Sequence, residues 1–144
     1  MGKRYLQAAS VYLPIRVLAG IIMGIIHDFR LASVHAHINL LGWVSMAHFG
    51  LIYHFYPQAA NSKLAKTQFR FHNIGVPVML GGIAVQVITG SNAALPVAII
   101  GSIVVVAGVI LYTNNLFKHI GKDSQTMIRI ISFPPKKENI ATFK

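Results

Sequence analysis

Four apolar stretches, each close to the length that crosses a lipid bilayer, dominate this chain of 144 residues. They cover about residues 8–26, 34–56, 69–89 and 93–117. A helix needs roughly 20 apolar residues to cross the hydrocarbon core, and lipid offers no partners to unpaired backbone groups. The pattern therefore predicts an all-α integral membrane four-helix unit over residues 1–120, followed by a basic cytoplasmic tail over residues 121–144.

Basic residues are concentrated on one side of these predicted spans. The chain carries 13 Lys and Arg against 3 Asp and Glu, for a formal net charge of +10. With four crossings, both termini and the connection between the second and third spans share one side, which carries nearly all of this charge. The positive-inside rule then predicts both termini in the cytoplasm. The membrane we expect is the bacterial inner (cytoplasmic) membrane. No aromatic platform is interleaved with the basic residues, which argues for contact with anionic lipid and against nucleic acid.

His35 and His37 lie one residue apart at the start of the second predicted span. Imidazole is costly inside a membrane, so such histidines are functional candidates. Side chains two residues apart on a helix point about 200° apart, so the pair cannot chelate one ion from a single face. It can offer one nitrogen to each of two neighbouring sites, which favours axial ligation of haem iron. Gly42 and Trp43 join the candidate cofactor site, because glycine lets a porphyrin approach the backbone and an indole N–H can reach a polar partner.

The absence of cysteine leaves histidine, methionine and oxygen as metal ligands. His72 and His54 have the same predicted depth in the membrane. Together with His48 they form a candidate second site for copper or a second haem. The alternative is that these histidines only pack between helices, held by hydrogen bonds. His48 also shares a helix face with His37, about 16 Å away along the axis, as stacked haems would require. The competing function is copper or other metal handling through these histidines and Met79. The third candidate function is that of a non-catalytic assembly partner of a respiratory complex.

The run HAHINLLGWVSMAHFGLIYHFYP, beginning at His35, resembles the tenth helix of the catalytic subunit of haem–copper oxidases. The likeness is to the cytochrome cbb-type and nitric-oxide-reductase-like branches, and FRFHNIGVPVM resembles the start of that subunit's eleventh helix. The match covers residues 34–82 and is carried by H-x-H, LGW and FG. It implies that His35 is axial to a high-spin haem and His37 to a low-spin haem. Haem b as cofactor, and a respiratory electron donor or acceptor as partner, follow from the resemblance.

Two segments that complete the oxidase site in oxygen-reducing branches of that family are missing. The chain has no adjacent His-His pair and no His-Pro-Glu-x-Tyr segment, which supply the copper ligands and the active-site tyrosine there. It also has four of the twelve helices, and three copies would supply twelve. Since closed symmetry is usual, we expect a homotrimer in which His35 of one subunit and His37 of the next ligate the same iron. The expected function is electron transfer, or redox interaction with O₂ or NO, oxidoreductase-like if active but without a complete oxidase site.

Overall fold

Helices account for all the regular secondary structure in residues 1–132, the part of the chain described by the computed structural model. Side chains are described for residues 1–119. In chain order the elements are α1 (Gly2–Ile26), α2 (Ala32–His37), η1 (Ile38–Val44), α3 (Ser45–Phe55), α4 (Pro57–Ala60), α5 (Lys63–Thr89), η2 (Asn92–Ala94) and α6 (Leu95–Ser132). η1 is π-helical, η2 is a short 3₁₀ turn, and α2, η1 and α3 follow one another without a break. The predicted all-α class is confirmed for the described residues.

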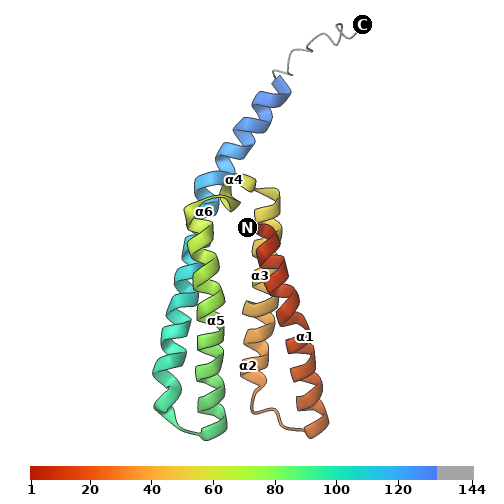
Figure 1. Cartoon of the computed structure of the whole chain (residues 1–144), viewed down its shortest axis with the longest axis vertical. Coiled ribbons are helices and arrows are strands. Elements are labelled where there is room, and N and C mark those ends of the chain that lie inside the picture. The colour runs from red at the N-terminus through yellow and green to blue at the C-terminus, as the bar shows by residue number, and fades with distance from the viewer. Residues whose placement is uncertain (133–144) are drawn as a thin grey trace, which may run out of the picture.

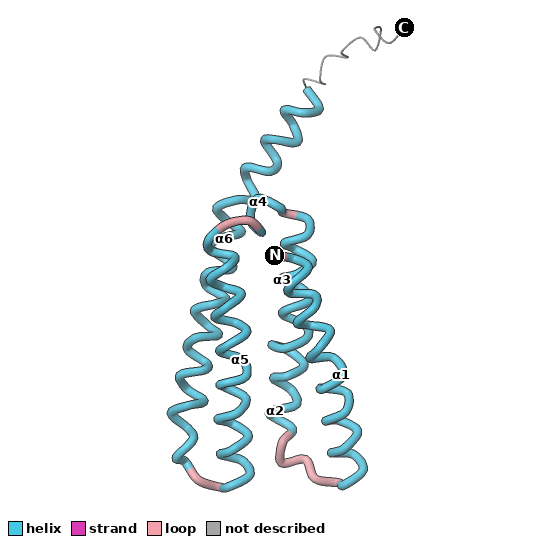
Figure 2. Tube along the Cα trace, in the orientation of Figure 1, coloured by secondary structure: helices cyan, strands magenta, loops and turns pink. Residues whose placement is uncertain are grey.

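The long helices form two antiparallel hairpins (Figure 1). α1 pairs with the run α2–η1–α3, and α5 pairs with α6. The connections within the hairpins, residues 27–31 and 90–91, lie at the same end of the molecule, here called the hairpin end (Figure 2). The opposite end, here called the basic end, holds the N-terminus and α4. Its exposed cationic side chains are Lys3, Arg4, Lys63, Lys66, Arg70 and Lys118.

α5 and α6 approach each other closely because glycines line their contact. A Cβ on Gly82 would lie 2.5 Å from the backbone N of Ala98, and one on Gly101 would collide with the backbone N of Met79. Gly75 precedes Gly82 by two helical turns and meets α6 in the same way, with a Cβ 3.1 Å from the Gly101 carbonyl oxygen. Small residues at such positions let helix backbones pack closely in membranes.

The helical run that carries His35 and His37 widens into a π-helix at η1. The N–H of Ser45 donates to the carbonyl of Leu40, five residues earlier, and Ser45 Oγ donates to the same oxygen at 2.8 Å. The carbonyl of Leu41 accepts a bond of 2.9 Å from His72 Nε2 on α5. A π-helical turn accommodates an extra residue within a helix. The two hairpins are therefore joined by a polar bond at the point where the helix widens.

Three helices are long and apolar enough to cross a membrane: α1, α5, and the stretch from Asn92 to His119. The second predicted span is helical throughout α2, η1 and α3 but is divided by the π-helix. α1 and α5 begin earlier than the predicted spans, and α6 continues to Ser132. The predicted domain boundary at residue 120 thus falls inside α6. The rest of the predicted tail, residues 133–144, lies outside the described residues.

Two clusters of buried side chains hold the hairpins together. The cluster nearer the basic end is aromatic and includes Tyr5, Met46, Phe49, Tyr53 and Tyr112. The cluster nearer the hairpin end is aliphatic and comprises Val34, Val76, Met79, Leu80 and Val105. The outward faces of α1 and α6 are rich in exposed isoleucine, leucine and valine, as expected for surfaces in contact with lipid.

Candidate functional site

His35 lies on α2 with its ring against α1. A Cβ on Gly20 would come within 3.1 Å of the imidazole Cε1, so the lack of a side chain at Gly20 makes room for the ring. Nδ1 of His35 is buried and has no hydrogen-bond partner among the described residues. Buried polar atoms are normally satisfied, so this nitrogen calls for a water, an ion or another ligand.

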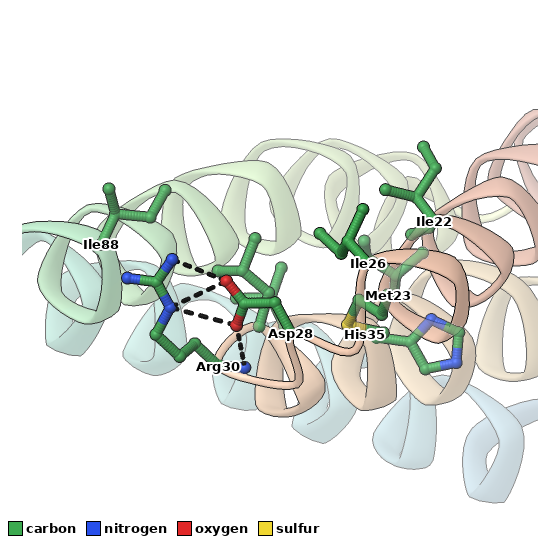
Figure 3. A pocket seen from close by; sticks show the side chains of 11 residues that line it. Ile22, Met23, Ile26, Asp28, Arg30, His35 and Ile88 are labelled. Atoms are coloured by element: carbon green, nitrogen blue, oxygen red, sulfur yellow. Dashed lines mark hydrogen bonds and ion pairs between the residues drawn. The ribbon is translucent and has the colours of Figure 1, made fainter.

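A cavity of about 320 Å³, here called the outer cavity, opens beside His35 near the hairpin end (Figure 3). α1, α2 and the end of α5 line it with mostly apolar side chains, including Ile22, Met23, Ile26 and Ile88. Asp28 and Arg30, from the connection at the hairpin end, supply its polar edge. Its volume is at the lower end of the range of ligand pockets, about 300–1,000 Å³. It is an apolar space with one imidazole in its wall.

Asp28 and Arg30 bind each other at the edge of the outer cavity. Arg30 Nη2 and Nε donate to the carboxylate at 2.6 and 3.0 Å, and the backbone N–H of Arg30 donates to it at 3.0 Å. These bonds lower the pKa of Asp28 to about 2, and the carboxylate raises the pKa of Arg30. The positive charge of Arg30 is therefore compensated within the chain.

His37 faces a different part of the molecule. Its Nδ1 lies 2.7 Å from the carbonyl oxygen of Ser33, so Nδ1 carries the proton and donates. In the neutral ring this leaves Nε2 with a free lone pair, which is the usual state of a histidine that ligates a metal. His37 lines a second cavity of about 300 Å³, here called the inter-hairpin cavity, with Leu41 and with side chains of α5 and α6. His119 makes the same bond to Asn115 but lines neither cavity.

The two histidines of the H-x-H pair thus line separate apolar cavities. His35 borders the outer cavity beside α1, and His37 borders the inter-hairpin cavity beside α5 and α6. This placement agrees with the expectation that the imidazole rings of His35 and His37 point in different directions. A single metal ion cannot take both rings of one chain, because each lies against a different partner helix.

Gly42 and Trp43 contact α1 rather than either cavity. A Cβ on Gly42 would lie 2.5 Å from Cδ1 of Tyr12, so the open face of this glycine is filled by the tyrosine ring. The Trp43 ring lies under the guanidinium of Arg16, whose Cζ is 5.2 Å from the ring centroid. Within one chain, both residues therefore serve packing between α1 and η1.

Arg16 is a candidate that sequence reasoning missed. Because α1 begins at Gly2, Arg16 lies near the middle of the helix, about 21 Å along the axis from Gly2 and about 15 Å from Ile26. Its Nε is buried without a partner among the described residues, and so is Oδ1 of Asn39. The predicted span over residues 8–26 put Arg16 about 12 Å from its start, whereas α1 begins six residues earlier, at Gly2. The signal was the intramembrane arginine itself, which is rare and usually functional.

The proposed second site, His48, His54 and His72, is not brought together. His48 and His54 are exposed, whereas His72 is fully buried and donates from Nε2 to the Leu41 carbonyl. Phe49 lies between two of them, with ring centroids 6.3 Å from His48 and 5.2 Å from His72. Among the described residues, no group of three or more His, Cys, Asp or Glu could hold a metal ion.

A buried polar network near the basic end was also not predicted. Tyr53 Oη donates to Gln68 Oε1 at 2.5 Å, and Asn115 Nδ2 donates to Tyr53 Oη at 3.1 Å and to the Ala59 carbonyl at 2.9 Å. Ser62 Oγ donates to Asn115 Oδ1 at 2.7 Å and caps α5 by accepting from a backbone N–H. These bonds join α3, α4, α5 and α6 where the four meet.

Comparisons of the chain with models of protein families, with curated proteins and with solved structures found no match.

Proposed function

We propose that this chain is a membrane b-type haem protein in which His35 and His37 are axial ligands of iron. The observation that carries the proposal is that the two histidines border two separate apolar cavities. His37 Nε2 has a free lone pair, because Nδ1 donates to Ser33. His35 Nδ1 is buried and has no hydrogen-bond partner among residues 1–119, so it is available to an added ligand.

The chemistry of these donors fits haem iron. Haem supplies an iron centre that changes oxidation state, and two neutral imidazoles favour a low-spin form suited to electron transfer. The Ser33 carbonyl orients the His37 ring and makes its free nitrogen more basic. If one histidine binds weakly, the open position could take O₂ or NO, which would make the protein a sensor or a minor reductase.

A homotrimer in the cytoplasmic membrane, with both termini in the cytoplasm, is part of the proposal. The two cavities, of about 320 and 300 Å³, are at the lower end of the range of ligand pockets, and in this proposal a neighbouring protomer completes the wall of each haem site. His35 of one subunit and His37 of the next would do so across each interface of a closed ring. Lipid surrounds the apolar outer surface, and the basic end faces anionic headgroups.

Absorption spectra of the purified protein test the proposal. Oxidised and dithionite-reduced spectra, with a pyridine haemochrome, should show low-spin haem b in the wild type. His35→Ala and His37→Ala should each lose these bands. His119→Ala is the matched control and should keep them, because His119 makes the same Nδ1 bond as His37 without lining a cavity. A haem-free wild type would overturn the proposal, and copper bound through His48, His54 or His72 would then be sought by metal analysis.

Complementation between the two variants tests the shared site. Neither variant alone can form an interface with both ligands. Co-expressed in equal amounts, His35→Ala and His37→Ala would restore both ligands at about one quarter of interfaces if trimers assemble at random. Recovery of about a quarter of the wild-type haem is expected. No recovery, or a monomer with full haem content in mild detergent, would refute the trimer.

A further inference from the structure

The outward face of α5 begins with three cationic side chains at the basic end. Lys63, Lys66 and Arg70 are exposed and, at spacings of three and four residues, lie on one face of the helix. The residues that α5 buries at this end, among them Gln68 and His72, lie on the opposite face. The three cations therefore point away from the bundle, toward whatever surrounds the protein.

This arrangement of charges is unfavourable within the chain. Lys63 and Lys66 lie in the first turns of α5, where the positive end of the helix dipole disfavours cations, and the first turn has no acidic residue. Lys66 and Arg70 are four residues apart, a spacing at which like charges repel each other. None of the three forms an ion pair with another residue in the part of the chain whose side chains are described. An anion from outside this part of the chain would relieve the repulsion.

The same face of α5 continues as a surface suited to lipid chains. Ile74 and Val85 are 61% and 50% exposed, and Pro77 and Gly81, which lie between them, are exposed as well. A Cβ on Gly81 would meet nothing within 4 Å, so the helix surface is narrow and open there. Gly81 lies about 16.5 Å along the axis from Arg70, close to half the thickness of the hydrocarbon core. Cations and apolar surface therefore follow each other in the order of a headgroup and its acyl chains.

We propose that this face of α5 binds an anionic phospholipid, with the lipid phosphate between Lys66 and Arg70. The acyl chains lie along the apolar continuation of the face, past Ile74. Lysine and arginine form charge-assisted hydrogen bonds to phosphate oxygens, and their long side chains reach the headgroup layer from different depths. Lys63 adds to the positive field at that layer. The inference goes beyond the haem function, because it needs the chain to lie in a membrane but does not depend on a cofactor.

The total positive charge of the basic end is the competing explanation for any attraction of anionic lipid. Lys3 and Arg4 on α1 are exposed at the same end of the molecule. Removing this pair lowers the net charge by as much as removing Lys66 and Arg70. A diffuse positive field would lose as much attraction from either change, whereas a site on α5 would lose it from only one. The two pairs of cations are therefore matched for an experiment.

The test measures the lipid selectivity of the full-length protein in mild detergent by native mass spectrometry. Phosphatidylglycerol and phosphatidylcholine with identical acyl chains are offered in equal amounts. The wild type should retain phosphatidylglycerol about 5-fold more often, the effect expected of one cation near the headgroups. Lys66→Gln/Arg70→Gln should lose most of this preference, and Lys3→Gln/Arg4→Gln should keep it. All four positions are exposed and glutamine is a good helix former, so both double variants should fold, which circular dichroism checks.

Each outcome decides the proposal. Equal losses in the two double variants would mean that the basic end acts as diffuse charge, and the site on α5 would be wrong. A wild type without a preference between the two lipids would overturn it as well. If inorganic phosphate at the same concentration as the lipid displaces phosphatidylglycerol, the site takes free anions and the lipid assignment is wrong. A preference that withstands phosphate and is lost only with Lys66 and Arg70 supports the lipid site.

Discussion

Replacing Gly82 with alanine tests the close packing of α5 against α6. The added methyl group would lie 2.5 Å from the backbone N and 2.8 Å from the Cα of Ala98. Backbone atoms of a helix cannot rotate away as a flexible side chain can. Restoring an ordinary contact of 3.4 Å requires the two helices to separate locally by about 0.9 Å.

The expected loss of stability follows from that separation. A gap of 0.5–1 Å forfeits about a quarter to a half of each atomic contact, and one contact is worth about 0.1–0.2 kcal/mol. Over the roughly 40 contacts that one well-packed residue makes, the loss is about 1–4 kcal/mol. Core substitutions that add volume cost a similar amount, about 1–3 kcal/mol. We therefore expect Gly82→Ala to lower the free energy of unfolding by about 2 kcal/mol.

Gly81→Ala is the matched control, because it adds the same methyl group one residue away on the same helix. A Cβ on Gly81 would meet nothing within 4 Å. The better helix propensity of alanine should then leave stability unchanged or raise it by up to about 1 kcal/mol. Both variants would be compared by reversible unfolding in mixed micelles with increasing SDS. Equal effects of the two substitutions would refute the close α5–α6 contact.

Three further perturbations have defined outcomes. Because its folded-state pKa is lowered to about 2, ionised Asp28 contributes stability that is present above its ordinary pKa of 3.8 and lost as pH falls toward 2. In Arg30→Gln, a carboxyl NMR titration should show the pKa of Asp28 returning toward 3.8. Asn115→Ala should lower the free energy of unfolding by about 1–3 kcal/mol, because it leaves Tyr53 and Ser62 without a hydrogen-bond partner. Asn114→Ala, at the exposed neighbouring position, should change it by less than about 0.5 kcal/mol. His72→Phe leaves a carbonyl of η1 without its ring donor and should cost about 1–3 kcal/mol in the same unfolding assay.

Hydropathy located the helices but not their ends. The predicted first and third spans began at residues 8 and 69, whereas α1 and α5 begin at Gly2 and Lys63. The added turns contain basic residues such as Arg4 and Lys66, which lower hydropathy but are good helix formers and remain exposed at the basic end. Hydropathy marks the part of a helix that suits lipid, and the helix itself extends as far as its backbone bonds do.

At the candidate site, too, local sequence patterns predicted some features and missed those that depend on how the helices pack. The divergent directions of His35 and His37 follow from helix periodicity alone, so the sequence was sufficient for them. The burial of Arg16 Nε without a partner among residues 1–119 depends on the register of α1 against η1, which is not encoded in a local pattern. The bond from His72 to the Leu41 carbonyl depends on a π-helix, which has no sequence signature in apolar runs of this kind.

The π-helix at η1 also separates the direction of the histidine segment from a change of one codon. A π turn takes up one residue more than an α turn, so loss of one residue from Ile38–Val44 with a return to α-helical winding would leave α2 and α3 in nearly the same relative orientation. The aromatic cluster around Phe49 and the seat of His35 against Gly20 would both stay in place. The change would fall instead on the bond between the two hairpins, because an ordinary α-helical turn engages the carbonyl that the π turn leaves to His72.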